Sequence, residues 1–260
     1  MTTDDPADGL FPESVAETYD DPGGANDPAV ITPAVDLLER LADGGPVLEL
    51  AVGTGRIAAP LAARGVRVGG IELSQAMARR VADKPGGDAV GVTVGDMTTT
   101  RFDAFGDVGP GDFALAYLVF NTISNVTTQD GQVEVFRNAA AHLRPGGLFL
   151  VEVGVPALRR LPPGQDSVPY AVAPDPAGGG YVGFDRYDVV TQRFTSNHVT
   201  VGPDGVGRFR TVPFRYAWPA EMDLMARLAG MRLRHRWAGW DESPFTAESD
   251  NHVSVWEKPQ

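Results

Sequence analysis

The sequence contains no cysteine, which excludes disulfides, thiolate nucleophiles and cysteine metal sites together. Its four histidines, at positions 142, 198, 235 and 252, lack the spacing of metal ligands, so we expect no metal. No segment approaches the roughly 20 apolar residues of a membrane span. The acidic N-terminus lacks the basic start and apolar run of a signal peptide, so we expect a cytoplasmic protein.

Cations are also scarce, because lysine occurs only at positions 84 and 258 and the formal net charge is −12. A nucleic-acid-binding protein needs a cationic surface to displace counterions from phosphates, and the sequence has no basic run. The same argument disfavours an anionic membrane surface. We therefore expect a small-molecule partner and neither nucleic acid nor membrane, and we leave a homodimer open.

The chain has 260 residues, which is enough for one or two domains. Residues 1–45 form a predicted N-terminal helical segment, in which residues 1–12 are rich in turn formers and are expected to be mobile. Pro33 is expected to open a helix, because proline is tolerated in a first turn. Residues 46–260 form the predicted main domain.

Short apolar segments alternate with helical ones in this domain, which indicates a parallel sheet covered on both faces by helices. A different pattern, with β-branched residues at alternating positions, predicts a small antiparallel insertion at about 165–218, over the carboxyl edge of the sheet. Its predicted strands are 181–190, 193–201 and 208–218, after a Gly- and Pro-rich loop at 164–180. The predicted strands of the main sheet are 47–52, 66–73, 90–97, 112–120, 148–155, 231–240 and 252–257, with helices at 55–63, 74–84, 130–143 and 219–229.

The segment Glu49-Leu-Ala-Val-Gly53-Thr-Gly55 follows a predicted strand and precedes a predicted helix. Its glycines let the backbone turn tightly and let a ligand approach the main chain. Glu49 is a carboxylate inside an apolar strand, so it needs a partner or a wet cleft. Glu72 and Asp96 end the next two strands, where they can accept hydrogen bonds from ribose hydroxyls and from an exocyclic amine such as that of adenine. We expect the three carboxylates to converge at one edge of the sheet.

These motifs and their order resemble the class I S-adenosylmethionine (SAM)-dependent methyltransferases. The resemblance implies a Rossmann-like α/β fold, with a seven-stranded sheet, helices on both faces and the last strand antiparallel. The inserted sheet is similar to that of the small-molecule branch, which includes amino-sugar N-methyltransferases of antibiotic pathways. It implies transfer of a methyl group from SAM to nitrogen or oxygen of a small molecule. The residues that carry the resemblance are 49–55, 70–74, 95–97, 118–121 and 143–147.

The resemblance also assigns roles to individual residues. The glycine loop lies under the methionine part of SAM, Glu72 binds the ribose, and Asp96 and Met97 bind adenine. Residues 119–121 run beside the methyl donor, and Tyr19 reaches the cofactor's carboxylate. The sequence departs from the family where Ala51 and Arg56 replace frequent glycines. The expected cofactor contacts are Tyr19, Glu49, Ala51, Gly53, Thr54, Gly55, Glu72, Leu73, Met77, Asp96, Met97, Val119 and Phe120.

Methyl transfer to an activated donor needs alignment and desolvation, and a base only where the acceptor must first lose a proton. His198 is the candidate base, because an unperturbed histidine titrates near neutrality, although a surface histidine would fit the same position. Asn121 could orient the acceptor or serve a turn, and Glu152 could contact an acceptor amine or form an ion pair. Asp185 and Tyr187 could line the acceptor pocket or lie on the solvated face.

Two alternatives use the same loop. Gly53-x-Gly55-x-x-Ala58 also fits the dinucleotide fingerprint of an NAD(P)-dependent oxidoreductase. Glu49 counts against that cofactor, since a carboxylate near the loop repels a pyrophosphate but attracts a sulfonium and an ammonium. The other alternative is a non-catalytic cofactor-binding module that uses the insertion to bind a partner.

Overall fold

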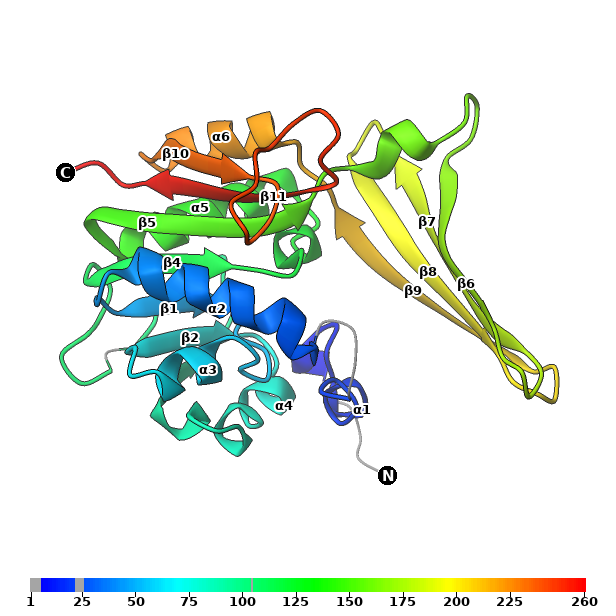
Figure 1. Ribbon diagram of the computed structural model, residues 1–260, viewed down its shortest axis with the longest axis horizontal. Helices are drawn as coiled ribbons and strands as arrows, with labels where there is room; N and C mark the ends of the chain where they lie inside the picture. The colour runs from blue at the N-terminus through cyan, green and yellow to red at the C-terminus, as the bar shows by residue number, and fades with distance from the viewer. Residues whose placement is uncertain (1–5, 22–25, 104) are drawn as a thin grey trace.

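The computed structural model describes residues 6–21, 26–103 and 105–260, and contains two sheets (Figure 1). The larger sheet has seven strands in the order β10-β11-β5-β4-β1-β2-β3. The neighbours from β5 to β3 pair in parallel, and β11 runs antiparallel between β5 and β10, which confirms the predicted fold class. The strands are β1 (Val47–Leu50), β2 (Val68–Glu72), β3 (Gly91–Val94), β4 (Phe113–Leu118), β5 (Leu143–Gly154), β10 (Arg232–Trp237) and β11 (Asn251–Glu257).

Helices cover both faces of this sheet because its central strands carry buried side chains on both sides. Along β4, Leu115 and Tyr117 pack with α2 (Pro28–Ala42) and α3 (Ala58–Ala63). The intervening Ala116 and Leu118 pack with α5 (Gln129–His142) and α6 (Pro219–Leu228) on the other face. The remaining helices are the short α1 (Glu13–Ala16) and α4 (Gln75–Ala78). None of the helices within the described residues is both long and apolar enough to cross a membrane.

Several helix boundaries differ from the predictions. The helix expected to open at Pro33 begins at Pro28, because the Asp27 carboxylate accepts a hydrogen bond from the Ala29 amide and caps the helix there. Ser74 caps α4 as predicted, but α4 ends at Ala78, and 3₁₀ hydrogen bonds replace the expected helix up to residue 84. α3 starts three residues after Gly55.

The insertion has four strands where three were expected, namely β6 (Ser167–Pro174), β7 (Gly180–Asp188), β8 (Arg193–Val201) and β9 (Gly207–Arg215). β6 lies in the segment predicted as a loop. Its prolines, Pro169 and Pro174, are tolerated because β6 is an edge strand, and the register shifts between Pro169 and Ala171. The insertion projects from the carboxyl edge of the large sheet (Figure 1).

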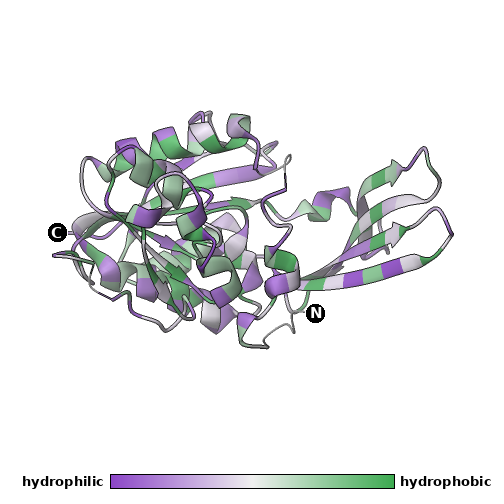
Figure 2. Ribbon diagram, turned by 90° about the horizontal axis from the view of Figure 1, so that it is seen from below, coloured by the Kyte–Doolittle hydropathy of each residue, from purple (hydrophilic) through white to green (hydrophobic). Residues whose placement is uncertain are grey.

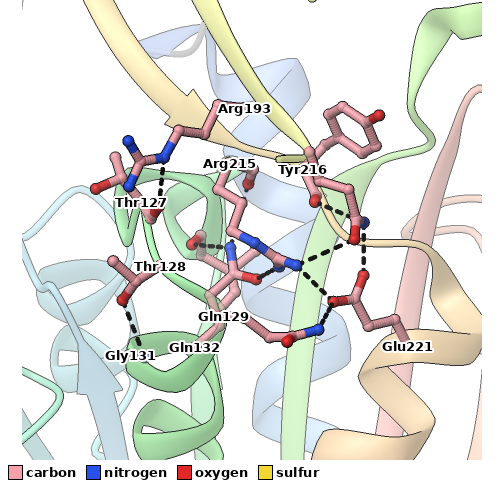
Figure 3. Close-up of polar contacts among 11 residues, drawn as sticks. Thr127, Thr128, Gln129, Gly131, Gln132, Arg193, Arg215, Tyr216 and Glu221 are labelled. Carbon is pink, nitrogen blue, oxygen red and sulfur yellow. Dashed lines mark hydrogen bonds and ion pairs between the residues drawn. The ribbon is translucent and has the colours of Figure 1, made fainter. Parts of the chain in front are cut away.

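A buried arginine fixes the root of the insertion (Figure 3). Arg215, at the end of β9, is 3% exposed, and its guanidinium donates to Gln132 of α5 and to Glu221 of α6. It also donates to Gln192 in the β7–β8 turn, which exchanges backbone and side-chain hydrogen bonds with Tyr216. One buried charged residue therefore joins the insertion to two helices of the body, and Arg193 of β8 adds a hydrogen bond to the Thr127 carbonyl.

We predict that Arg215→Met lowers the free energy of unfolding by about 3 kcal/mol, because it leaves the partly buried Glu221 carboxylate without its cation and the buried Gln132 amide oxygen without its donor. Urea denaturation of the whole chain measures this loss. The control is Arg186→Met, which removes an exposed ion pair with Asp166 and should change stability little. Equal stabilities of the two variants would contradict the role of Arg215.

Candidate active site

The predicted cofactor residues gather around two adjoining cavities at the carboxyl ends of β1, β2, β3 and β4. The larger has a volume of about 260 Å³, and the smaller, of about 30 Å³, lies toward Glu49. Tyr19, Ala51, Gly53 and Thr122 line both. The larger cavity is also lined by Glu72, Leu73, Met77, Asp96 and Met97, and the smaller by Glu49, Thr54, Val119 and Phe120.

Gly55 is the one expected contact residue that lines neither of these cavities. Its backbone has φ +82°, and a Cβ at this position would lie 3.0 Å from Cγ1 of Val81. The glycine is therefore explained by a left-handed turn packed closely against a neighbouring segment.

Two backbone amides orient the Glu72 carboxylate. Its Oε2 accepts a hydrogen bond from the Gly53 amide at 2.8 Å, and its Oε1 accepts one from the Ser74 amide at 2.9 Å. Burial raises the pKa of this carboxyl, and both amides oppose the rise. Each oxygen keeps a further lone pair, so the carboxylate can still accept hydrogen bonds from two neighbouring hydroxyls.

Glu49 is buried at the smaller cavity, where the Tyr117 hydroxyl donates to its Oε2 at 3.0 Å. Burial raises the pKa of Glu49 to about 8, although Tyr117 and Arg56 both lower it. At neutral pH this carboxyl therefore becomes fully ionised only when another cation approaches. Asp96 lines the larger cavity with Glu72, so the three carboxylates converge on adjoining cavities as expected.

Three residues other than glycine have left-handed backbone at this edge, namely Ala51 (φ 56°), Phe120 (φ 56°) and Asn121 (φ 61°). Each such conformation costs about 1–2 kcal/mol, so neighbouring contacts must hold it. Glu152 accepts a hydrogen bond from the Phe120 amide at 2.6 Å, and Asn121 accepts one from the Gly154 amide at 2.6 Å. Glu152 and Asn121, both candidates for acceptor binding, thus brace the turn after β4.

Arg56 is a site residue that the sequence analysis noted only as a departure from the family. Its guanidinium carbon lies 3.7 Å from the centre of the Phe120 ring and 5.7 Å from that of Tyr19. It lines the smaller cavity together with Glu49. A cation and a carboxylate on one small cavity suit a zwitterionic group such as the amino-acid end of SAM.

The N-terminal segment closes the larger cavity. Residues 8–11 line it, the Ser74 hydroxyl donates to the Phe11 carbonyl at 2.7 Å, and Glu13 forms ion pairs with Arg79 and Arg80. We expected residues 1–12 to be mobile. Residues 1–5 lie outside the described residues, but residues 6–12 are packed, because these long-range contacts fix them.

A third cavity, of about 350 Å³, lies between the end of β5 and the insertion, and we call it the acceptor cavity. Asp185 and Tyr187 line it, as the sequence suggested, and Asn121 forms part of its wall on the body side. His198 does not line it, because it lies two cross-strand pairs further along β8 than Ser196. The remaining walls include residues 153–157, Tyr170, Phe194, Ser196, Phe214, Tyr216 and Asn251.

Comparisons with known proteins identify the chain. Residues 47–147 match a methyltransferase domain family. The chain is 32% identical to the CcbJ methyltransferase of Streptomyces caelestis, whose structure aligns with a TM-score of 0.80 over 95% of this chain and 96% of that one. It belongs to the SAM-dependent methyltransferases. It is also 27% identical to a Streptomyces cypemycin N-terminal methyltransferase over 96% of this chain and 98% of that protein.

The fold of this methyltransferase is also similar to that of SAM-bound CalS10, an amino pentose methyltransferase from Micromonospora echinaspora. The TM-score is 0.66 and the identity 18%, over 94% of this chain and 95% of that one. SAM is the cofactor. The larger cavity fits a cationic nucleoside, because its described lining includes three carboxylates, of Asp8, Glu72 and Asp96, and neither lysine nor arginine. That lining disfavours the pyrophosphate of the oxidoreductase alternative.

The raised pKa of Glu49 predicts two opposite effects of pH. The unfolded chain binds fewer protons than the folded one between the ordinary glutamate pKa, about 4.3, and about 8, so this contribution to folding stability is lost as pH rises through 8. Binding of the cationic cofactor should strengthen over the same pH range, because it needs the ionised carboxylate. We expect Glu49→Gln to flatten both trends, measured by urea denaturation and by calorimetric titration with SAM between pH 6 and 8.

The exposed Glu134, paired with Arg137 on α5, provides the control variant Glu134→Gln, which should keep both trends. A Glu49→Gln variant with the wild-type pH dependence would show that Glu49 is not the titrating group.

Proposed function

We propose that this methyltransferase N-methylates an amine-bearing small molecule of secondary metabolism, bound in the acceptor cavity. One observation carries the proposal. Asp185 Oδ1 is buried in the wall of that cavity, and the described residues offer it no hydrogen-bond partner. Similar proteins support a nitrogen acceptor, since they include the cypemycin N-terminal methyltransferase and the amino pentose methyltransferase.

A carboxylate oxygen buried without a partner is costly, and a protonated amine would satisfy it. Burial raises the pKa of Asp185, and contacts with Ser196 and Tyr187 oppose the rise. Aromatic rings surround the same space. Tyr187 stacks on Phe194 at 5.2 Å between ring centres, and Phe194 stacks on Phe214 at 5.1 Å. Aromatic faces attract ammonium groups, so the aromatic rings and the Asp185 carboxylate both favour an amine ligand.

The turn at residues 120 and 121 connects the cofactor and acceptor cavities. Phe120 lines the smaller cofactor cavity, and Asn121 lines the acceptor cavity. A methyl group on SAM beside Phe120 would therefore face an acceptor beside Asn121. SAM supplies the methyl group, and the chain aligns the two reactants and excludes water from between them.

The remaining cofactor contacts follow from the same placement. Glu72 would hold the ribose hydroxyls, while Asp96 and Met97 would hold adenine. At the amino-acid end, Glu49 would face the ammonium, and Arg56 and Tyr19 would bind the carboxylate. We also propose that the protein is cytoplasmic, as the composition of its N-terminus predicts.

The acceptor proposal predicts that labelled methyl groups from SAM are transferred to members of a panel of small aromatic amines and not to the alcohols of the same shape. We expect Asp185→Asn to lower kcat/KM for the reactive amine roughly 100-fold, because removing one partner of a buried charge pair costs about 2–5 kcal/mol. Asp188→Asn is the matched control, since Asp188 is exposed at the end of the same strand and accepts hydrogen bonds from Val190 and Thr191 of its own turn. Labelling of alcohols alone would contradict the proposal.

We further propose that two copies pair through the outer face of the insertion. The strand register places Val172, Val182, Val199 and Phe209 in one row across the sheet, on the side away from the acceptor cavity. Val172 is 71% exposed and Phe209 64% exposed. Figure 2 shows hydrophobic positions along these projecting strands. Exposed apolar patches of this kind are typical of protein interfaces.

Light scattering during gel filtration should therefore give the mass of a dimer. The double variant Val172→Asp and Phe209→Asp should give a monomer that still binds SAM, whereas Val190→Asp in the exposed β7–β8 turn should remain a dimer. A wild-type monomer would exclude this pairing.

A further inference from the structure

A chain of hydrogen-bonding groups leads from the acceptor cavity along the insertion. Ser196 lies opposite Asp185 in the β7–β8 pairing and contacts its carboxylate. The Ser196 hydroxyl lies 3.2 Å from the Tyr170 hydroxyl, which lies 3.2 Å from Nδ1 of His198. The Tyr181 hydroxyl lies 2.7 Å from the same nitrogen and 3.0 Å from the Tyr170 hydroxyl. These contacts lead from the half-buried Asp185, whose Oδ1 is buried, to the half-buried His198.

A glycine makes this chain sterically feasible. A Cβ on Gly183 would lie 2.4 Å from both Cε2 and Cζ of Tyr170, so any other residue would displace the ring. Because Gly183 pairs with His198 on β8, the Tyr170 ring crosses β7 at this point, and its hydroxyl reaches both Ser196 and His198. A packing role for Tyr170 would need only its ring, whereas the chain of hydrogen-bonding groups needs its hydroxyl.

An amine acceptor must lose a proton during the reaction, and this chain of hydrogen-bonding groups can carry that proton away. An ammonium docked on Asp185 has no lone pair, so it must lose a proton before its nitrogen can attack the methyl group. The buried carboxylate can take that proton, but it must pass it on before the next acceptor binds. Ser196 and Tyr170 are the hydroxyl groups through which the proton could leave the aromatic cavity.

We propose that Asp185, Ser196, Tyr170 and His198 form a proton relay that carries the acceptor's proton from the cavity to solvent. The inference rests on the proposed amine acceptor. An N–H proton of the ammonium moves to the Asp185 carboxylate, which Ser196 contacts, and the freed lone pair forms the bond to the methyl carbon. The carbon–sulfur bond breaks, and its electron pair stays on sulfur. Each hydroxyl then accepts one proton and donates one, His198 Nδ1 receives the last, and Nε2 releases a proton to water.

The groups that face His198 suit it as the end of a relay. Burial lowers its pKa, as does Arg210, which lies opposite it on β9, while the charge of Asp185 raises it. At pH 7 its Nδ1 is therefore largely free to accept a proton. Burial and Tyr170 raise the pKa of Tyr181 to about 12, so Tyr181 stays a neutral hydroxyl beside Tyr170 and His198.

The test uses the full chain, SAM and the amine that the acceptor panel identifies. We expect His198→Gln and Tyr170→Phe each to lower kcat about tenfold at pH 7 with KM unchanged, less than the roughly 100-fold that full general-base catalysis contributes. Added imidazole should restore the rate of His198→Gln, since it replaces the group at the open end of the relay, but not that of Tyr170→Phe. His235→Gln is the matched control, because His235 stacks on Trp237 in β10, outside the insertion.

A second measurement needs no turnover, so it separates failure of the relay from failure of the proposed function. NMR titration of the His198 ring, with phenethylamine as the probe, should show a lower pKa when the ammonium neutralises Asp185. Asp185→Asn should abolish that difference, and Gly183→Ala, which displaces Tyr170, should weaken it. An unchanged His198 titration, or losses confined to KM without imidazole rescue, would overturn the relay.

Discussion

The organisation of this methyltransferase depends on carboxylates that are buried without a cationic side chain bonded to them. Glu49 is 4% exposed and Glu72 5% exposed, and their hydrogen bonds come from a tyrosine hydroxyl and from backbone amides. Neutral donors orient a carboxylate but compensate its burial only in part, so the pKa of each rises. Such groups bind a cation more strongly than exposed ones would, because the surrounding dielectric is low. The fold thus places carboxyl groups where an approaching cation favours their ionised form.

The insertion also contains a carboxylate oxygen that is buried without a cationic partner, namely Asp185 Oδ1, which lies among aromatic rings. The two negative sites lie on opposite sides of the turn at Phe120 and Asn121, whose left-handed backbone is held by Glu152 and by the Gly154 amide. A strained turn persists only where its surroundings fix it. Here the bracing groups come from β5, so the strand that carries the acceptor cavity also sets the wall of the cofactor cavity. In the proposed arrangement, one element would thereby align donor and acceptor.

The sequence predicts the main sheet and the positions of Glu49, Glu72 and Asp96, because parallel strands end at one edge and an acid at each end must face it. It does not predict that Ala51 adopts a left-handed conformation in the glycine loop, since tertiary contacts override local preference there. Arg56 lies over the ring of Phe120, which is 64 positions away in the sequence. Local sequence patterns do not predict such a long-range contact. The sequence of residues 6–13 resembles a mobile tail, and only the fold shows that Ser74 contacts Phe11 and that Arg80 contacts Glu13.

The strand β6 shows why the acceptor-binding part of the methyltransferase is difficult to predict from the sequence. Its prolines and irregular register make it resemble a loop, yet it supplies Tyr170, whose ring crosses β7 only because Gly183 leaves room. An edge strand needs few backbone hydrogen bonds, so its sequence is free to serve the acceptor. The opposite end of the insertion is fixed by Arg215, which is buried and tied to two helices. The acceptor cavity therefore combines a rigid root with a loosely specified edge, an arrangement that lets the acceptor change without disturbing the cofactor site.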